Sequence, residues 1–372
     1  MRVLYLFAGV KRKSGFGPCL RKLARKAKVP VDIQELDLLR GGARHNLLHG
    51  TKRRRWLRLI REGRYNMVIA SPPCGTFSRA RWANKTGPPP LRMKHCPRGF
   101  PWLRGPHKEA VKQANQLADY TFEALEAQLQ DVQAMALAEH PEDLGAVHGN
   151  LPGTMWDFDA AKKLMERADT VTGALYQSDF GAPYAKPTRL LGRLDGLETV
   201  VRVGPPTFNE HGKYTGPLGG PKPQEMSLVG KDAQRGFRTT PAAAWAPKLC
   251  EKLAELALAH FLAVRDGPSM GRRTTKNEEI PPAVINEGTN TLKMPYMVSN
   301  PYKAQPSGTP QDDMPDTKRA RTKEALEVVD STVTASQRSS SSSGPPPPPD
   351  QYPTPSPKVS GGPGANGPPR SL

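Results

Sequence analysis

Cysteine and long apolar runs are scarce in this chain of 372 residues. Its 4 cysteines, at positions 19, 74, 96 and 250, match neither a disulfide framework nor the spacing of a metal site. We therefore expect a reducing, intracellular environment and no bound metal. The first apolar run is too short for a signal peptide, and no stretch is long enough to span a bilayer, so no membrane association is expected.

Acidic residues are scarce in the first third of the chain. Residues 1–108 carry 26 Lys and Arg against 4 Asp and Glu, so the formal net charge of +19 arises entirely there. Concentrated positive charge is typical of a surface that binds a polyanion, and we expect nucleic acid as the partner. The basic stretch 52–55 predicts an amphipathic helix whose charged face either contacts DNA or is merely solvated.

Short apolar runs alternate with helical patterns over most of the chain. Residues 3–7, 31–36, 65–70 and 134–138 have strand length, and residues 20–28, 108–129 and 247–264 have helical spacing. This alternation predicts an α/β fold with a doubly wound, mostly parallel sheet, formed by residues 1–264. Residues 265–372 are rich in Pro, Ser and Gly, a composition that predicts disorder.

The segment Ser71-Pro72-Pro73-Cys74 directly follows the apolar run 65–70. Two prolines fix φ twice and remove two backbone donors, so the chain must leave the sheet in a stiff extended turn. Ligands of open α/β sheets bind beyond the carboxyl ends of the strands, which is where this turn presents Cys74. Taken alone, the turn is equally compatible with a small cysteine packed in the core.

Two other strand ends are predicted to reach the same edge of the sheet. The run 3–7 is followed by Ala8-Gly9, and the run 31–36 carries Glu35 near its end, with Asp37 just after it. Glycine lets the backbone approach a nucleoside cofactor, and an acid at this distance commonly binds the ribose hydroxyls. The run 134–138 leads into Glu139, which brings a carboxylate to the edge that holds Cys74.

The order of these pieces resembles the cytosine-5 DNA methyltransferase family. LFAG at 6–9 is similar to its first cofactor motif, SPPC at 71–74 to its nucleophile motif and EHP at 139–141 to its Glu-Asn-Val motif. Residues 179–189 resemble, more loosely, the segment whose arginines hold substrate. The resemblance implies a Rossmann-like methyltransferase fold, S-adenosyl-L-methionine as cofactor and cytosine in DNA as substrate. The chain departs from the family in four ways: an insertion at 10–13, His140 in place of asparagine, Lys186 with Arg189 in place of a longer arginine set, and a shortened target-recognition segment at about 190–240.

The resemblance also implies roles for individual residues. Cys74 would be the nucleophile that adds to C6 of a flipped cytosine, and Glu139 the acid that neutralises charge at ring N3. The cofactor would contact Phe7, Ala8 and Gly9, with Glu35 or Asp37 on the ribose. Substrate or nucleic-acid contacts are expected from Ser71, Pro72, Pro73, Ser78, Arg79, Arg81, Lys186 and Arg189. Of these, Arg79 and Arg81 are also expected to favour the Cys74 thiolate.

Two classes of function remain open. The first is an active methyltransferase on DNA, with RNA as a variant substrate. The second is a non-catalytic relative that binds nucleic acid through its basic third, a reading favoured by the insertion at 10–13 and by His140. The basic segment 318–323 predicts nuclear import in a eukaryote or is an ordinary charged patch. The sequence gives no indication of oligomeric state.

Overall fold

The computed structural model describes residues 1–83, 87–219, 226–228, 230–232 and 236–267. The predicted tail lies outside the described residues except for its first three positions, and so does the basic segment 318–323. Part of the predicted recognition segment at 190–240 is likewise outside them. Among the described helices, none is both long and apolar enough to cross a membrane.

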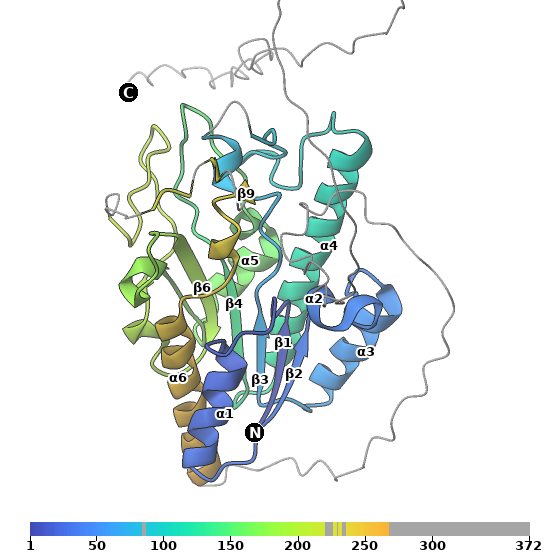
Figure 1. Ribbon diagram of the computed structural model, residues 1–372, viewed down its shortest axis with the longest axis vertical. Coiled ribbons are helices and arrows are strands. Elements are labelled where there is room, and N and C mark those ends of the chain that lie inside the picture. The colour runs from blue at the N-terminus through green and yellow to red at the C-terminus, as the bar shows by residue number, and fades with distance from the viewer. Residues whose placement is uncertain (84–86, 220–225, 229, 233–235, 268–372) are drawn as a thin grey trace, which may run out of the picture. The chain divides into compact units, whose positions relative to one another are not determined.

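A seven-stranded sheet in the order β2-β1-β3-β4-β6-β5-β7 forms the centre of the fold (Figure 1). Its strands are β1 (Arg2–Leu6), β2 (Asp32–Leu36), β3 (Met67–Ala70), β4 (Met135–Pro141), β5 (Val171–Tyr176), β6 (Pro187–Arg193) and β7 (Arg202–Val203). The first four run parallel, whereas β6 lies antiparallel between β4 and β5, and β7 is antiparallel to β5. The predicted α/β class with a mostly parallel, Rossmann-like sheet is confirmed.

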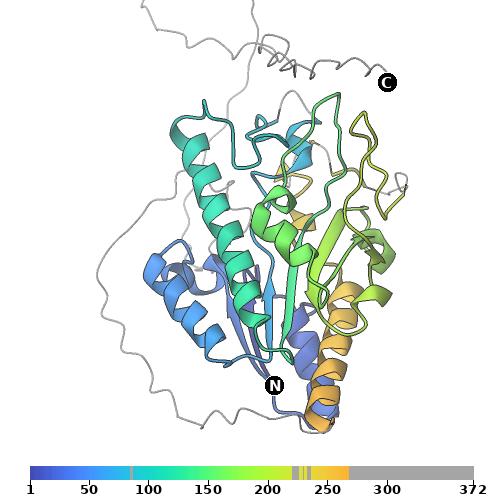
Figure 2. The same cartoon turned by 180° about the vertical axis from the view of Figure 1, so that it is seen from behind.

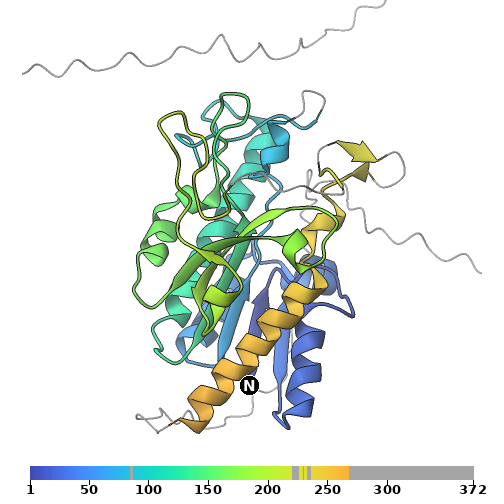
Figure 3. The ribbon, with the colours of Figure 1, turned by 90° about the vertical axis from the view of Figure 1, so that its left-hand side faces the viewer.

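Helices cover both faces of the sheet. On one face α1 (Phe16–Lys26) and α6 (Pro247–Asp266) pack side by side (Figure 3). The other face is covered by α3 (Gly50–Arg61), α4 (Gly105–Gln128) and α5 (Asp159–Met165) (Figure 2). The shorter elements are α2 (Leu38–Gly41), η1 (Gly42–His45), η2 (Arg79–Arg81), η3 (Met155–Asp157), η4 (Gln177–Phe180), η5 (Leu197–Thr199), η6 (Pro241–Ala243), β8 (Lys231–Asp232) and β9 (Gly236–Phe237).

Several helix and strand boundaries differ from the sequence prediction, and two of these differences have a clear physical reason. Helix α1 begins at Phe16 rather than near residue 20, since Pro18 is tolerated in the first turn, where its missing N–H has no partner to lose. Strand β4 continues through Pro141 instead of ending at residue 138. Its extension is paired with β6, in which Leu190 is the partner of Glu139 and Arg189 the partner of His140.

Alternation along the central strands divides the core into two layers. In β3, Met67 and Ile69 pack towards α1 and α6, whereas Val68 and Ala70 pack towards α3 and α4, and all four are fully buried. Such burial on both faces is typical of a central parallel strand. The same alternation in β4 places Glu139 on the α1 and α6 side and His140 on the opposite side.

Candidate active site

Cys74 lies in the loop that follows β3, where the two prolines were predicted to present it. Pro72 is buried, Pro73 is exposed and Cys74 is half-buried. The loop then turns back, because the Phe77 N–H donates to the carbonyl of Cys74 at 2.9 Å. Internal hydrogen bonds therefore fix the backbone that carries the thiol.

The Arg81 side chain donates hydrogen bonds to backbone carbonyls of the same loop and of the segment that follows it. Its Nε donates to the carbonyl of Gly75 at 2.7 Å, and its Nη1 donates to that of Pro89 at 2.8 Å. The carbonyl of Ser78 accepts the Arg81 N–H at 3.1 Å, closing the turn that begins η2. Arg81 thus braces the loop beside Cys74, and its contact with nucleic acid stays a prediction.

Glu139, in the last part of β4, and Lys186, just before β6, lie close enough to Cys74 for their charges to act on its thiol. Lys186 Nζ is 3.4 Å from Glu139 Oε1, and the two side chains are only 11% and 7% exposed. Burial raises the pKa of Cys74, the positive charge of Lys186 lowers it and the negative charge of Glu139 raises it. We call Cys74, Glu139 and Lys186 the thiol cluster.

Lys186 has an unusual backbone conformation. Its φ of +33° lies in the left-handed region, which non-glycine residues rarely adopt and which costs on the order of 1–3 kcal/mol. Its carbonyl accepts a hydrogen bond from the Thr188 hydroxyl at 3.0 Å, and Ala185 beside it accepts from the N–H of Gln177 at 2.7 Å. Surrounding contacts hold this strained residue with its ammonium on Glu139.

Arg189 does not face the site, and the prediction that it contacts substrate is corrected. It is fully buried and forms a two-pronged pair with Glu142, at 2.6 and 2.7 Å. Its Nη1 also donates to Thr172 Oγ1 and to the carbonyl of Gly204, each at 2.7 Å. A guanidinium whose donors are taken inside the core cannot reach a substrate without breaking a buried pair.

Arg79 is also used internally. It donates to the carbonyls of Gly145 and Ala146, the second at 2.7 Å, and so fastens the loop after β4 to the loop after β3. Neither Arg79 nor Arg81 is among the charges that shift the pKa of Cys74, for which Lys186 supplies the stabilising cation. The sequence hypothesis that these two arginines favour the thiolate is therefore corrected.

The glycine turn after β1 is shaped by Asp37. Phe7 and Gly9 have φ values of +61° and +65°, and the Gly9 N–H donates to Asp37 Oδ2 at 2.8 Å. The other oxygen, Oδ1, accepts the Leu39 N–H at 2.8 Å and caps α2. Because both of its oxygens accept backbone N–H groups, Asp37 is a structural residue, and Glu35 remains the candidate for a ribose contact.

Arg40 is a residue that the sequence reasoning missed. It donates to the carbonyls of Ala8, Gly9 and Val10, at 3.3, 2.6 and 3.3 Å, and its Nη1 lies 2.6 Å from Glu35 Oε2. It therefore ties the glycine turn to the acid at the end of β2. The one feature of the sequence that could have pointed to Arg40 is its position, three residues after Asp37.

The Glu35 carboxylate lies against Gly17, in the first turn of α1. A Cβ placed on Gly17 would come within 2.6 Å of Glu35 Oε1, so only glycine leaves room there. Gly9, by contrast, would have open space around an added Cβ. Gly17 therefore lets the Glu35 carboxylate lie against the first turn of α1, close to the glycine turn after β1.

The insertion at 10–13 connects the glycine turn to the end of the fold. Arg12 donates to the carbonyl of Trp245 at 3.0 Å, and the Trp245 ring lies 5.7 Å from that of Tyr5. The Tyr5 hydroxyl is 3.4 Å from Ser71 Oγ, in the loop that carries Cys74. The insertion thus acts as a tether between segments more than 200 residues apart, a role that no local pattern predicts.

His140 lies on the opposite side of the sheet from Glu139. Its ring packs edge-on against Phe77 and Trp156, at 5.1 and 6.1 Å between centroids. Burial, followed by the charges of Lys186 and Arg92, lowers its pKa to about 3. Neither ring nitrogen has a hydrogen-bond partner within the described part of the chain, so the imidazole is neutral and serves as packing behind the Cys74 loop.

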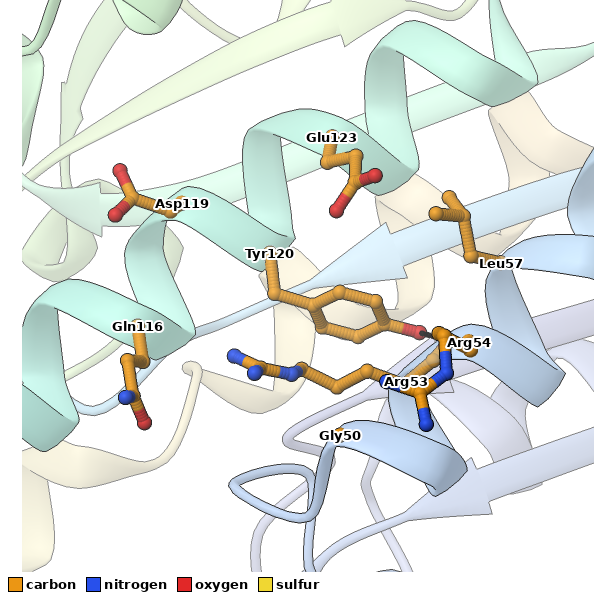
Figure 4. A pocket seen from close by; sticks show the side chains of 8 residues that line it. All are labelled: Gly50, Arg53, Arg54, Leu57, Gln116, Asp119, Tyr120 and Glu123. Carbon is orange, nitrogen blue, oxygen red and sulfur yellow. Dashed lines mark hydrogen bonds between the residues drawn. The ribbon is translucent and has the colours of Figure 1, made fainter.

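A pocket of about 250 Å³ lies between α3 and α4, on the helices and not at the thiol cluster (Figure 4). Arg53 extends along it towards Gln116, beneath the ring of Tyr120, whose hydroxyl donates to the Arg53 carbonyl at 3.4 Å. Asp119 and Glu123 on α4 also line it. This mixture of charges has no marked preference for an anion. In the described ranges, no group of three or more His, Cys, Asp or Glu residues is placed to hold a metal.

Comparisons with known proteins give one structural match to report. No protein-family model matches the chain, and no curated protein matches it. It is similar to the crystal structure of S. pombe Dnmt2 methyltransferase, with 17% sequence identity and a TM-score of 0.28. The match covers 52% of this chain and 51% of that chain, about half the length of each. The Rossmann-like assignment itself rests on the strand order and pairing described above.

Proposed function

We propose that this protein is an S-adenosyl-L-methionine-dependent methyltransferase that acts on C5 of cytosine in nucleic acid, with DNA preferred over RNA. The thiol cluster carries the proposal. It combines a nucleophile, a carboxyl group and a cation at the edge of the sheet where α/β proteins bind ligands. The family resemblance of the motifs that contain Cys74 and Glu139 supports the same reaction.

The cofactor would supply the methyl group as an electrophile. The residues that would hold it are Glu35, which lies against Gly17, and the turn from Phe7 to Gly9. Arg40 and Asp37 keep that turn in shape through contacts that involve no ligand. These residues fit a nucleoside with hydroxyls to bind and a backbone that comes close to it.

Cys74 begins the chemistry as a thiolate, which Lys186 stabilises. Its sulfur forms a bond to C6 of cytosine, and the electron pair of the C5–C6 double bond becomes available at C5. Glu139 meets the charge that develops at ring N3. After C5 has taken the methyl group, its proton passes to water, the C5–C6 double bond re-forms and the sulfur leaves C6.

A second candidate is a non-catalytic protein that keeps the fold and binds nucleic acid. It is favoured by the raised pKa of Cys74, since burial disfavours the reactive thiolate. The internal use of Arg79, Arg81 and Arg189 also removes cations that were predicted to hold substrate. The two candidates differ in whether a covalent bond to cytosine forms.

The test is covalent trapping on DNA and RNA that contain 5-fluorocytosine. Fluorine at C5 cannot leave as a proton, so methyl transfer should leave Cys74 bonded to C6 in a complex that survives denaturing electrophoresis. Cys74→Ser should abolish the complex, and Cys19→Ser, at another half-buried cysteine, should leave it intact. Glu139→Gln should slow its formation by about 10²- to 10⁴-fold. If no cofactor-dependent complex forms on either nucleic acid, the non-catalytic candidate replaces this proposal.

A further inference from the structure

Arg92 is a fully buried arginine without a carboxylate partner. It is 1% exposed, yet within the described ranges it forms no ion pair with any Asp or Glu. Burial, followed by the positive charges of Arg81 and Arg98, lowers the pKa of Arg92 to about 9. A buried cation without a counter-ion costs free energy that an apolar side chain of the same size would not. Stability alone therefore does not account for an arginine at this position.

The Arg92 guanidinium joins the loop that carries Cys74 to helix α4. Its Nη2 donates to Thr76 Oγ1 at 2.9 Å, two residues after Cys74. Its Nη1 donates to Asn115 Oδ1 on α4 at 2.9 Å, and to the carbonyl of Pro97 at 2.7 Å. The planar fork of a guanidinium holds several acceptors at once, which a single ammonium group does less well.

Phe77 is the second point at which Arg92 holds this loop. The guanidinium carbon lies 3.7 Å from the centroid of the Phe77 ring, which is a cation–π contact. Phe77 is buried, and its backbone N–H donates to the carbonyl of Cys74 at 2.9 Å. Arg92 thus contacts two consecutive residues, Thr76 and Phe77, of the turn that begins at Cys74.

The segment that carries Arg92 is itself fixed on both sides of that residue. The carbonyl of Leu91 accepts the Phe100 N–H at 3.0 Å. The Lys94 N–H donates to the carbonyl of Leu151 at 2.9 Å, in the segment after β4. Arg92 therefore holds the turn from a backbone that is hydrogen-bonded before any ligand arrives.

Arg81 and Arg92 act on this turn in different ways. Arg81 donates to the carbonyl of Gly75 and is partly exposed, so its side chain is within reach of a ligand. Arg92 is buried and cannot touch a substrate. Any effect of Arg92 on a reaction must therefore pass through the position of Cys74.

We propose that Arg92 is a positioning residue that sets where the Cys74 sulfur lies relative to the target base. This inference rests on the proposed function, because it assigns a task within that reaction. Reacting atoms must be held about 3–3.5 Å apart, and a misplacement of about 1 Å can slow a reaction about 10²-fold. Lys186 acts on the charge of the thiol, whereas Arg92 fixes its place.

The test follows two reactions of Cys74 in Arg92→Met. The first is alkylation by iodoacetamide at pH 8, measured by mass spectrometry of the Cys74 peptide. A loosened turn should relieve the burial that is the largest cause of the raised pKa of Cys74, so alkylation should become about 3- to 10-fold faster. The second is trapping on 5-fluorocytosine, which should become about 10- to 100-fold slower because the sulfur is misplaced.

Arg98→Met is the matched control. Arg98 lies in the same segment with its guanidinium carbon 4.2 Å from the Phe158 ring, but it is half-exposed and paired with Asp119. It should change neither rate. Thr76→Val removes only the hydroxyl that accepts from Arg92, and it should shift both rates in the directions given for Arg92→Met, by about 2- to 10-fold.

The buried Cys250 reports whether a variant remains folded. It should stay unreactive in all three variants. If it becomes reactive in Arg92→Met, the whole fold has opened and Thr76→Val decides the question.

Faster alkylation together with slower trapping would support the inference, because a displaced thiol is more open to a small reagent and less well aimed at a bound base. Any other combination would overturn it. Alkylation involves no methyl transfer. A wild-type protein that forms no covalent complex contradicts the proposed function, and alkylation then still decides whether Arg92 holds Cys74. Trapping at an unchanged rate in Arg92→Met contradicts this inference alone.

Discussion

Two cation–carboxylate pairs join the ends of β4 and β6, and they differ in how completely they are satisfied. Arg189 and Glu142 are fully buried and joined by two direct hydrogen bonds; Glu142 also accepts one from the Tyr214 hydroxyl, and Arg189 donates one to Thr172 Oγ1. Lys186 and Glu139 share one contact at 3.4 Å and retain some exposure. In each pair the two residues are 47 positions apart. The completed pair stabilises the sheet. The incomplete pair leaves hydrogen-bonding positions on Glu139 and Lys186 that can serve Cys74 and a substrate.

The largest effect is expected from breaking the completed pair. Arg189→Met should destabilise the protein by about 3–5 kcal/mol, because it leaves the Glu142 charge buried without its partner. Lys186→Met should cost less, about 1–2 kcal/mol, since a single longer contact is lost. Urea unfolding of both variants checks this. Equal losses of stability would show that the two pairs do not differ as described.

The next effect concerns His140, a buried imidazole that has no hydrogen-bond partner among the residues that the structure describes. Its pKa is about 3 in the folded protein against an ordinary value of 6.5. The free energy of unfolding is therefore not reduced by His140 above pH 6.5, where the ring is neutral in both the folded and the unfolded protein. It falls as the pH drops from 6.5 towards 3, because the unfolded protein then binds a proton that the folded protein does not. Between pH 8 and pH 5 the loss should be on the order of 2 kcal/mol.

His140→Asn should remove this pH dependence, whereas the exposed His211→Asn should leave it unchanged. Chemical denaturation at several pH values measures both. A wild-type stability that is flat from pH 8 to pH 5 would show that His140 is not held neutral. The position would then be more polar than its packing against Phe77 and Trp156 indicates.

The smallest effect tests whether the incomplete pair acts on the thiol. Lys186→Met should raise the pKa of Cys74 and slow its alkylation by iodoacetamide about 3- to 10-fold near pH 8, because the stabilising cation is gone. Lys186→Arg should restore the rate. Mass spectrometry of the Cys74 peptide separates this site from the other cysteines. Unchanged alkylation in Lys186→Met would remove Lys186 from the thiol cluster.

Patterns local in sequence determined much of the fold. The run 65–70 is apolar except for Asn66, and its last four residues became the buried β3, while the stripe over 108–129 became most of α4. The two prolines before Cys74 placed the thiol beyond the strand end, because their effect on φ acts on the residues next to them. Glu139 was likewise expected at the same edge. These features depend on side-chain periodicity and backbone restriction, which the sequence displays directly.

Only the tertiary structure decided which groups the charged side chains contact. Strand β6 entered the sheet antiparallel between β4 and β5 and thereby extended β4 past Glu139 to Pro141. That insertion brought Lys186 to the carboxylate and buried Arg189 on Glu142, although the sequence treats both as cations near the end of one motif. Arg40 and Arg12 found their carbonyl partners in the same way. A cation in the sequence shows only that a charge must be satisfied. Whether a carboxylate, a carbonyl or a substrate satisfies it depends on which distant segments the fold brings together.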